Sequence, residues 1–220
     1  MAFQDTGGKI VMSGARSAIL DRARRAQRTG RIPVVIPVVA VPSVTAATPD
    51  ARVLERFVTE LGQLGVTVHL EDTAEAVRER VAGIVAGRLT LAWDAAVLPY
   101  DVARLLPSAV TGASPRAQQA AADVGVTGCD AAIAETGSLM LLSGEGKPRT
   151  ASLLPPLHVA ILKRADLRFS MAECLQERAA DISASACCTF ITGPSRTADI
   201  ELTLTLGVHG PGRVVVVVGP

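Results

Sequence analysis

The most constraining feature of the sequence is the alternation of helical and extended patterns through residues 48–93. Apolar residues recur at helical spacing across 48–64, and the extended run 66–70 follows. A second helical pattern spans 72–86 and leads into the extended run 89–93. A helix between two strands at this spacing is typical of a βαβ unit, which has parallel strands and a right-handed crossover. The sequence therefore predicts an α/β fold around a parallel or mixed sheet.

The rest of the chain continues this mixed pattern. Further helices are predicted at 13–30, 116–124 and 170–182, and further strands at 131–134, 139–143, 157–163, 187–192 and 214–218. Hydrophobic residues make up 49% of the chain and aromatic residues only 3%, so the core must consist mainly of aliphatic side chains. A chain of 220 residues is long enough to bury such a core.

Two parts of the chain differ in composition, an N-terminal part at 1–47 and the α/β domain predicted for 48–220. The N-terminal part contains the predicted helix and an extended arm at 31–47 that is broken by prolines. Basic residues dominate the surface of the helix: Arg16, Arg22, Arg24, Arg25 and Arg28. This basic face is either an ordinary solvated surface or a docking surface for an acidic partner.

The charge balance and the cysteine pattern argue against several classes of function. Lys and Arg number 22 against 21 Asp and Glu, and a net charge of +1 gives no field that attracts nucleic acid or an anionic membrane. None of the four cysteines forms a C-x-x-C pair, so no metal site and no cofactor of its own is predicted. The first residues lack a signal-peptide pattern, and the proline-broken apolar stretch 32–44 is too short to span a bilayer. A cytoplasmic location is therefore expected.

Three polar segments with glycine follow apolar runs, and functional groups of open α/β sheets gather beyond the carboxyl ends of strands. The first segment is 135–138, in which Glu135 is a candidate nucleophile or general base. Thr136 and Ser138 add hydroxyl groups, and Gly137 can adopt the positive φ of a tight turn. The alternative is that Glu135 only caps a backbone amide.

The second segment, 193–199, can present backbone amides to an anion, as the start of a helix does. Arg196 would add a charge-assisted hydrogen bond to a phosphate or carboxylate. The other candidate ligand-binding residues in this segment are Gly193, Ser195 and Asp199. The alternative is an ordinary turn in which Ser195 and Asp199 act as caps.

The third segment, 207–212, places His209 beside Gly210, where the imidazole can donate a hydrogen bond to an anion or carry a proton. Alternatively, His209 only bonds a backbone carbonyl. Asp130 and His158 are predicted to lie behind the three loops as supporting residues. His158 stands in an apolar run, so its expected role is structural.

In this order, three stretches of the chain resemble the lactate-utilisation domain (LUD) family: 124–144, 149–163 and 192–218. The resemblance implies a Rossmann-like α/β/α sandwich similar to the NagB/RpiA/CoA-transferase group. It also implies an association with iron–sulfur partner proteins in the oxidation of L-lactate to pyruvate, with the redox centre in a partner chain. CoA-transferases of the related fold use a glutamate that takes up the acyl group, and Glu135 invites comparison with it by position alone.

Two functions from different classes follow from these observations. The first, which we adopt, is a cluster-free accessory component of an L-lactate utilisation system that binds a small anionic metabolite or an iron–sulfur partner. The second is an independent enzyme similar to acyl- or CoA-transferases or to isomerases, in which Glu135 acts as nucleophile or base. In that enzyme Ser195 and Arg196 would hold an anion, and His209 would assist. A scaffold whose loops are purely structural is a third alternative.

Overall fold

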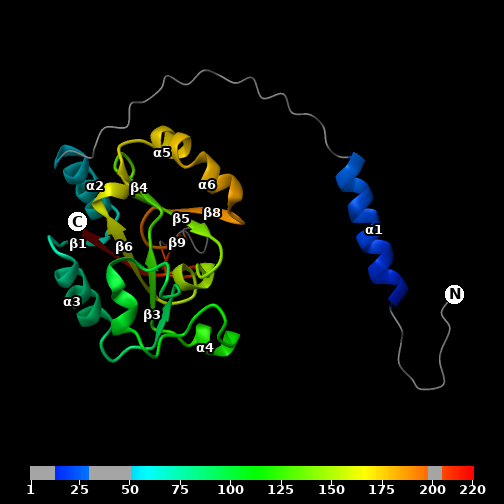
Figure 1. The fold of residues 1–220 in the computed structure, drawn as a ribbon, viewed down its shortest axis with the longest axis horizontal. Coiled ribbons are helices and arrows are strands. Elements are labelled where there is room, and N and C mark those ends of the chain that lie inside the picture. Colours follow the sequence, from blue (N-terminus) through cyan, green and yellow to red (C-terminus); the bar gives the residue numbers. More distant parts are fainter. Residues whose placement is uncertain (1–12, 30–50, 198–204) are drawn as a thin grey trace. The chain divides into compact units, whose positions relative to one another are not determined.

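The computed structural model describes residues 13–29, 51–197 and 205–220 (Figure 1). The chain divides into two compact units, Met1–Ser43 and Val44–Pro220. The first unit contains helix α1 (Ser13–Thr29), whose side chains from 14 to 26 are exposed. The proline-broken arm predicted at 31–47 lies outside the described residues.

A five-stranded, fully parallel sheet, called the main sheet below, forms the centre of the second unit. Its strands, in spatial order, are β1 (Thr67–Leu70), β11 (Arg213–Gly219), β6 (Leu157–Lys163), β3 (Val124–Gly128) and β2 (Thr90–Ala92). Central parallel strands are covered on both faces, so they consist of continuous apolar runs rather than alternating patterns. The five consecutive valines of β11 and the apolar run of β6 follow this rule.

A second, mixed sheet of four strands packs against the main sheet. In spatial order its strands are β7 (Leu167–Arg168), β4 (Ala131–Ile133), β5 (Ser138–Ser143) and β8 (Cys187–Ile191). Strand β5 pairs antiparallel with both β4 and β8, whereas β4 and β7 are parallel. A separate two-stranded antiparallel ribbon contains β9 (Arg196–Thr197) and β10 (Thr205–Leu206).

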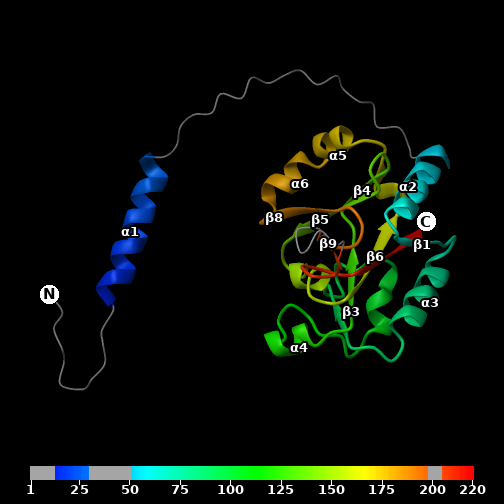
Figure 2. The ribbon, with the colours of Figure 1, turned by 180° about the vertical axis from the view of Figure 1, so that it is seen from behind.

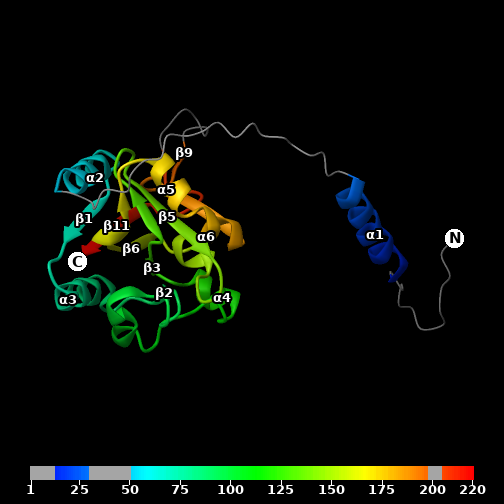
Figure 3. The ribbon, with the colours of Figure 1, turned by 45° about the horizontal axis from the view of Figure 1, so that its top comes forward.

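Helices cover both sheets. The α-helices of the second unit are α2 (Ala51–Gln63), α3 (Ala74–Val85), α4 (Arg116–Ala120), α5 (Met171–Glu177) and α6 (Ala179–Ala184). Short 3-10 helices are η1 (Pro99–Leu105), η2 (Arg149–Ser152) and η3 (Arg164–Asp166). Figure 3 shows α2 and the second sheet on one side of the main sheet and α3 on the other. Helices α5 and α6 lie along the second sheet in both Figure 1 and Figure 2.

Local sequence explains where these helices begin. The Thr73 hydroxyl accepts a hydrogen bond from the Ala76 N–H and caps α3. Helix α5 begins with a capping box, in which the side chains of Ser170 and Glu173 each accept from the backbone of the other. The helix predicted at 170–182 is interrupted at Arg178, so this prediction is wrong in its continuity. The bend places two helices, rather than one, over the second sheet.

The core lies mainly between the two sheets and beneath α2 and α3, and it is aliphatic apart from Phe57 and Trp93. A smaller cluster lies under α5 and α6, where Cys174 and Met140 are fully buried with their sulfur atoms 3.7 Å apart. The predicted α/β fold with a parallel sheet is confirmed. The central strand β3 was not predicted, because its sequence, VGVTG, contains two glycines. A Cβ at Gly125 would lie 1.7 Å from the Ala151 carbonyl oxygen, so only glycine fits there.

Candidate functional site

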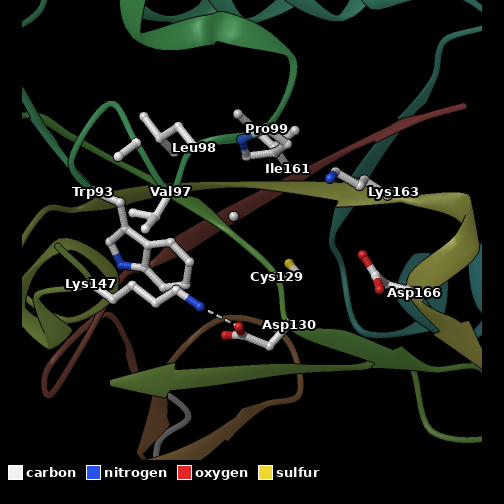
Figure 4. A pocket seen from close by; sticks show the side chains of 12 residues that line it. Trp93, Val97, Leu98, Pro99, Cys129, Asp130, Lys147, Ile161, Lys163 and Asp166 are labelled. Atoms are coloured by element: carbon white, nitrogen blue, oxygen red, sulfur yellow. Dashed lines mark hydrogen bonds and ion pairs between the residues drawn. The ribbon is translucent and has the colours of Figure 1, made fainter. Parts of the chain in front are cut away.

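A pocket of about 190 Å³ opens at the carboxyl ends of β2, β3 and β6 (Figure 4). In open α/β sheets this edge is where ligands bind. Strands β2 and β3 end directly before pocket residues, and β6 ends within the pocket at Lys163. The chemically useful side chains that line it are Trp93, Cys129, Asp130, Lys147, Lys163 and Asp166.

Asp130 and Lys147 form an ion pair on one wall of the pocket. The second carboxylate oxygen of Asp130 accepts a hydrogen bond from the Leu142 N–H at 2.8 Å, which fixes the carboxylate to β5. The Lys147 ammonium also lies 5.1 Å from the centroid of the Trp93 ring, within the range of a cation–π interaction. Both charges on this wall are therefore held by protein groups.

Cys129 lies between the two carboxylates of the pocket. Burial raises the pKa of its thiol, and the neighbouring Asp130 and Asp166 carboxylates raise that pKa further. A thiolate is the reactive form of cysteine, so Cys129 stays a neutral thiol near neutral pH and is a poor nucleophile. Its chemical contribution to the pocket is a small, weakly polar surface.

Lys163 differs from the other charged residues of the pocket. Asp166 is paired with Arg178 at 2.7 Å, and Asp130 is paired with Lys147. Lys163 is exposed, and its side chain makes no ion pair with any residue that the structure describes. Figure 4 shows its nitrogen directed toward the pocket. The pocket therefore offers one uncommitted positive charge to an anion.

The loop at 135–138 joins β4 and β5 and packs against α2. Gly137 has a φ of +64°, as a tight turn requires. The Glu135 carboxylate accepts a hydrogen bond from the Met171 N–H at 2.7 Å, the first residue of α5. The structure thus places Glu135 in the backbone-capping arrangement that was one of the two sequence-based alternatives. Its role as a nucleophile stays a prediction.

Hydroxyl groups connect this loop to the second predicted segment. The hydroxyls of Thr136 and Ser138 lie 2.8 Å apart, and that of Ser138 lies 2.7 Å from the hydroxyl of Thr192. Thr136 is exposed, whereas Ser138 is buried. Gly193, with a φ of +85°, follows at the turn and contacts Leu64.

The second and third segments contact each other through the backbone. The Ser195 N–H donates to the carbonyl oxygen of Pro211, and the Gly207 N–H donates to that of Ser195, both at 2.9 Å. Gly210 lies next to the Ser195 side chain. The Arg196 guanidinium donates to the carbonyl oxygen of Leu64, just after the end of α2.

Parts of the three predicted loops therefore form one cluster together with Thr192, the residue directly before the second loop. We call it the loop cluster (135–138, 192–196 and 207–211). His209 is exposed at its surface, and Asp199 lies outside the described residues. Residues 207–212 precede β11, so they lie at the amino edge of the main sheet. The expectation of a carboxyl-edge position is wrong for this loop, because it leads into a strand rather than out of one.

The two predicted supporting residues have different positions. Asp130 lines the pocket itself, rather than standing behind the loops. His158 is fully buried in β6, and its Nε2 lies 2.9 Å from the hydroxyl oxygen of Thr127. Its Nδ1 has no hydrogen-bond partner among the described residues. Burial lowers the pKa of His158 to about 4, so the ring is neutral at physiological pH.

Sequence reasoning missed most of the pocket, although a signal existed for part of it. Trp93 and Lys163 are the last residues of two predicted strands, 89–93 and 157–163, and the rule about carboxyl ends applies to them directly. Cys129 follows β3, which was not predicted, and Lys147 comes from the turn after β5. Only the packing of the two sheets brings Lys147 to this edge.

No group of three or more His, Cys, Asp or Glu side chains within residues 13–29, 51–197 and 205–220 is arranged to hold a metal ion. Among the same residues, no helix combines the length and the apolar character needed to cross a membrane.

A parallel five-stranded sheet with a pocket at its carboxyl edge defines this protein as an open-sheet α/β protein. The chain belongs to the LUD domain family, because the model of that domain matches residues 54–218. It is also 31% identical over 216 residues to lactate utilization protein C of Bacillus subtilis, a match that covers 85% of this chain and 87% of the relative.

Other relatives match over a shorter region. Lactate utilization protein C of Halalkalibacterium halodurans is 43% identical over 101 residues, and that of Shouchella clausii is 41% identical over 93 residues. These matches cover 44% and 41% of the respective relatives, so this chain spans less than half of their length there. A crystal structure of a DUF162 family protein from Deinococcus radiodurans has a TM-score of 0.64 and 22% identity, covering 77% of this chain and 98% of the other. That likeness shows the fold.

Proposed function

We propose that this protein takes part in lactate utilisation as a component that binds a small carboxylate anion in the pocket at the carboxyl edge. The relatives named lactate utilization protein C support the process, and the uncommitted charge of Lys163 supports the ligand class. Lys163 is the observation that carries the proposal, because the carboxylates that line the pocket are each paired with a protein cation, whereas Lys163 leaves its charge available to an anion.

The size and lining of the pocket favour a small acid. Ligand sites for drug-sized molecules are usually ~300–1,000 Å³, and this pocket of about 190 Å³ is smaller. The Trp93 ring and Ile161 provide apolar surface for a short carbon chain, and Asp130 provides an acceptor for a hydroxyl group. A lactate-sized molecule fits this description, whereas a molecule as large as coenzyme A exceeds it.

Iron–sulfur partner proteins would complete such a system. The cysteines of this chain lack the spacing that holds an iron–sulfur cluster, so the electrons of a lactate oxidation would pass to clusters in partner chains. The basic surface of α1 is the docking surface that we assign to such a partner. Charge reversal at Arg22 and Arg24 should then abolish co-purification of the iron–sulfur proteins without changing anion binding.

Calorimetric titration of the purified protein with lactate, pyruvate, acetate and coenzyme A tests the anion site. We expect Lys163→Met to weaken binding of the small acids by about tenfold or more, because a hydrogen bond to a charged group contributes ~1.5–3 kcal/mol. Arg213→Met is the matched control, since it removes the same charge from the amino edge of the same sheet. Equal affinity of the Lys163 variant and wild type for every acid would refute the site.

A further inference from the structure

A segment of chain after β2, residues 93–101, lies over one face of the main sheet at its carboxyl edge. We call it the cover segment. Its Trp93 ring and Pro99 pack against Gly128, the last residue of β3: a Cβ there would lie 3.3 Å from an atom of each. The absence of a side chain at Gly128 thus makes room for this end of the cover segment.

The other end of the cover segment rests on a second glycine. Gly219 ends β11, and a Cβ there would lie 2.6–2.8 Å from three atoms of the Tyr100 ring, closer than any side chain allows. The Tyr100 hydroxyl donates a hydrogen bond to the Pro220 carbonyl oxygen at 2.6 Å. The Tyr100 carbonyl accepts one from the guanidinium of Arg78 in α3 at 3.2 Å. The ring, the hydroxyl and the backbone carbonyl of Tyr100 thus each have a contact of their own.

The pocket lies between these two contacts. In the register of the sheet, Gly128 pairs with Ile161, and Gly219 pairs with Lys163. Ile161 and Lys163 both line the pocket, so the two glycines flank the part of β6 that a ligand would meet. The electrostatic surroundings of Tyr100 agree with this position. Its pKa is raised first by burial and then by the carboxylate of the pocket residue Asp166.

The turn that carries Tyr100 is strained. Tyr100 has φ and ψ of 59° and 24°, and Asp101 has 55° and 25°, so two consecutive residues with side chains adopt the left-handed region. Residues with side chains are strained in this region and persist there only where their surroundings fix them. Leu98 and Val102, on either side of this turn, are both buried, so the chain is anchored in the core before and after the strained pair.

We propose that Tyr100 is a positioning residue that holds the cover segment on the two glycines and thereby limits the pocket to small ligands. The wall next to Lys163 then consists of a segment that cannot retreat when a longer molecule enters. The identity of the ligand as a carboxylate rests on the proposed function, whereas the size limit is a property of the cavity alone. The wall therefore sets an upper limit on the length of the acid, and this limit comes from the wall, not from charge.

The thiol of Cys129 provides a test that needs no ligand, because it reports which molecules reach the pocket. Wild type and variants are treated with iodoacetamide or with its larger N-phenyl derivative, and labelling of Cys129 is followed by mass spectrometry of its peptide. The raised pKa of the Cys129 thiol slows both reactions, so they are run at alkaline pH with long incubation. The two reagents share one reactive group, so the ratio of their rates cancels the thiol pKa. In wild type we expect Cys129 to prefer the small reagent by about tenfold or more, the scale of steric selection in a fitted pocket.

Two variants release the cover segment in different ways. Tyr100→Ala removes the ring, and Gly219→Ala keeps Tyr100 but forces its ring away from β11. Both should bring the rate ratio at Cys129 to within about threefold of the ratio at the half-exposed Cys187, whose surroundings are unchanged. Asp101→Gly is the matched control: it relieves strain in the same turn, removes an exposed side chain with its surface ion pair to Arg104, and should leave the ratio as in wild type. Thermal unfolding establishes that each variant is folded. If Tyr100→Ala does not fold, the rate ratio of Gly219→Ala alone tests the proposal.

The same variants are then titrated with 2-hydroxy acids of increasing chain length. Wild type should bind glycolate and lactate and lose affinity for longer acids, whereas Tyr100→Ala and Gly219→Ala should accept them. An unchanged rate ratio at Cys129 in the folded variants overturns the proposal, and so does a wild-type ratio without size preference. A changed ratio together with failure of any acid to bind would support the wall and refute the carboxylate ligand.

Discussion

The pocket at the carboxyl edge and the loop cluster contain similar residue types but use them differently. In the loop cluster, Glu135 bonds the start of α5, and Arg196 bonds the carbonyl just after the end of α2. The Ser138 hydroxyl bridges two loops. In the pocket, the Asp130–Lys147 pair is satisfied, but Lys163 is not.

The difference shows how to separate supporting residues from ligand-binding residues of the same chemical type. A polar side chain that completes the hydrogen bonding of a helix end contributes to stability, and its loss is measured by unfolding. A side chain kept without a protein partner contributes little to stability, and its loss is measured by binding. We therefore expect substitutions in the loop cluster to change the free energy of unfolding, and substitution of Lys163 to change affinity.

The largest expected effect is on the pH dependence of stability and comes from His158, which is fully buried away from solvent. Its pKa is about 4 in the folded protein and about 6.5 when unfolded, so the unfolded state binds more protons between these values. The contribution of neutral His158 is fully present above pH 6.5 and falls by about 3 kcal/mol as the pH drops to about 4. Chemical unfolding at several pH values measures it. His158→Leu should lack this part of the pH dependence, and an identical pH profile for both proteins would contradict the prediction.

Glu135→Ala should lower the free energy of unfolding by about 2 kcal/mol, because it removes the carboxylate that accepts from the Met171 N–H. Glu135→Gln keeps an acceptor and should retain more than half of that stability. Neither change should alter the affinity for small acids. Urea titration and calorimetry of the same preparations measure both quantities. Loss of anion binding in Glu135→Gln, with stability retained, would instead favour an enzyme that uses Glu135.

Arg196→Met should lower the free energy of unfolding by about 0.5–1 kcal/mol. The exposed guanidinium bonds the carbonyl after α2 and lies at the negative end of that helix, where a cation is favourable. Arg196→Lys keeps the charge and should recover part of the loss. Urea titration in low and high salt measures the change, and the cost should shrink at high salt. A variant with wild-type stability but weakened anion binding would move Arg196 into the class of ligand-binding residues.

Lys163→Met should change the free energy of unfolding of the ligand-free protein by less than about 0.5 kcal/mol, as exposed positions without partners usually do. The same variant should lose the stabilisation by ligand, which for wild type is about 2.7 kcal/mol at 100 times the dissociation constant. Thermal unfolding with and without lactate measures both effects. Destabilisation of the ligand-free variant by more than about 1 kcal/mol would show that Lys163 has a structural partner. Lys163 would then belong with the supporting residues of the loop cluster, not with the ligand-binding residues.

The sequence was sufficient for elements whose pattern is local. The run 157–163 is β6 without any shift of its ends, and Ser170 with Glu173 predicted the capping box of α5. Strand β3 could not be recognised from local sequence. Its two glycines are required by contacts with residues that are distant in the sequence. Gly125 faces the Ala151 carbonyl, and Gly128 faces Trp93.

The candidate site was predictable only where a residue ends a recognisable strand. Asp130 was singled out, but as a supporting residue, because the strand before it was unknown. Lys163 ends the predicted strand 157–163, but its residue type alone does not distinguish a ligand-binding lysine from an ordinary charged residue at a strand end. The loop 207–212 was selected by composition, and composition does not say whether a loop enters or leaves a strand. The sequence pattern did not show at which edge of the sheet each loop lies.

The position of β11 between β1 and β6 also determines how the protein must reach its folded state. Pairing of Thr67 with Val215 closes a very long loop, and such distant contacts slow folding. Until residues 213–219 arrive, β1 and α3 have no strand to join them to β6, although their own sequence is complete. A chain under synthesis therefore leaves the β11-facing edge of β6 unpaired from residue 163 until residues 213–219 are made, and any fragment that stops before 213 keeps that edge unpaired. Such intermediates are prone to aggregate, so we expect efficient production to depend on chaperones or low temperature more than on the stability of the final fold.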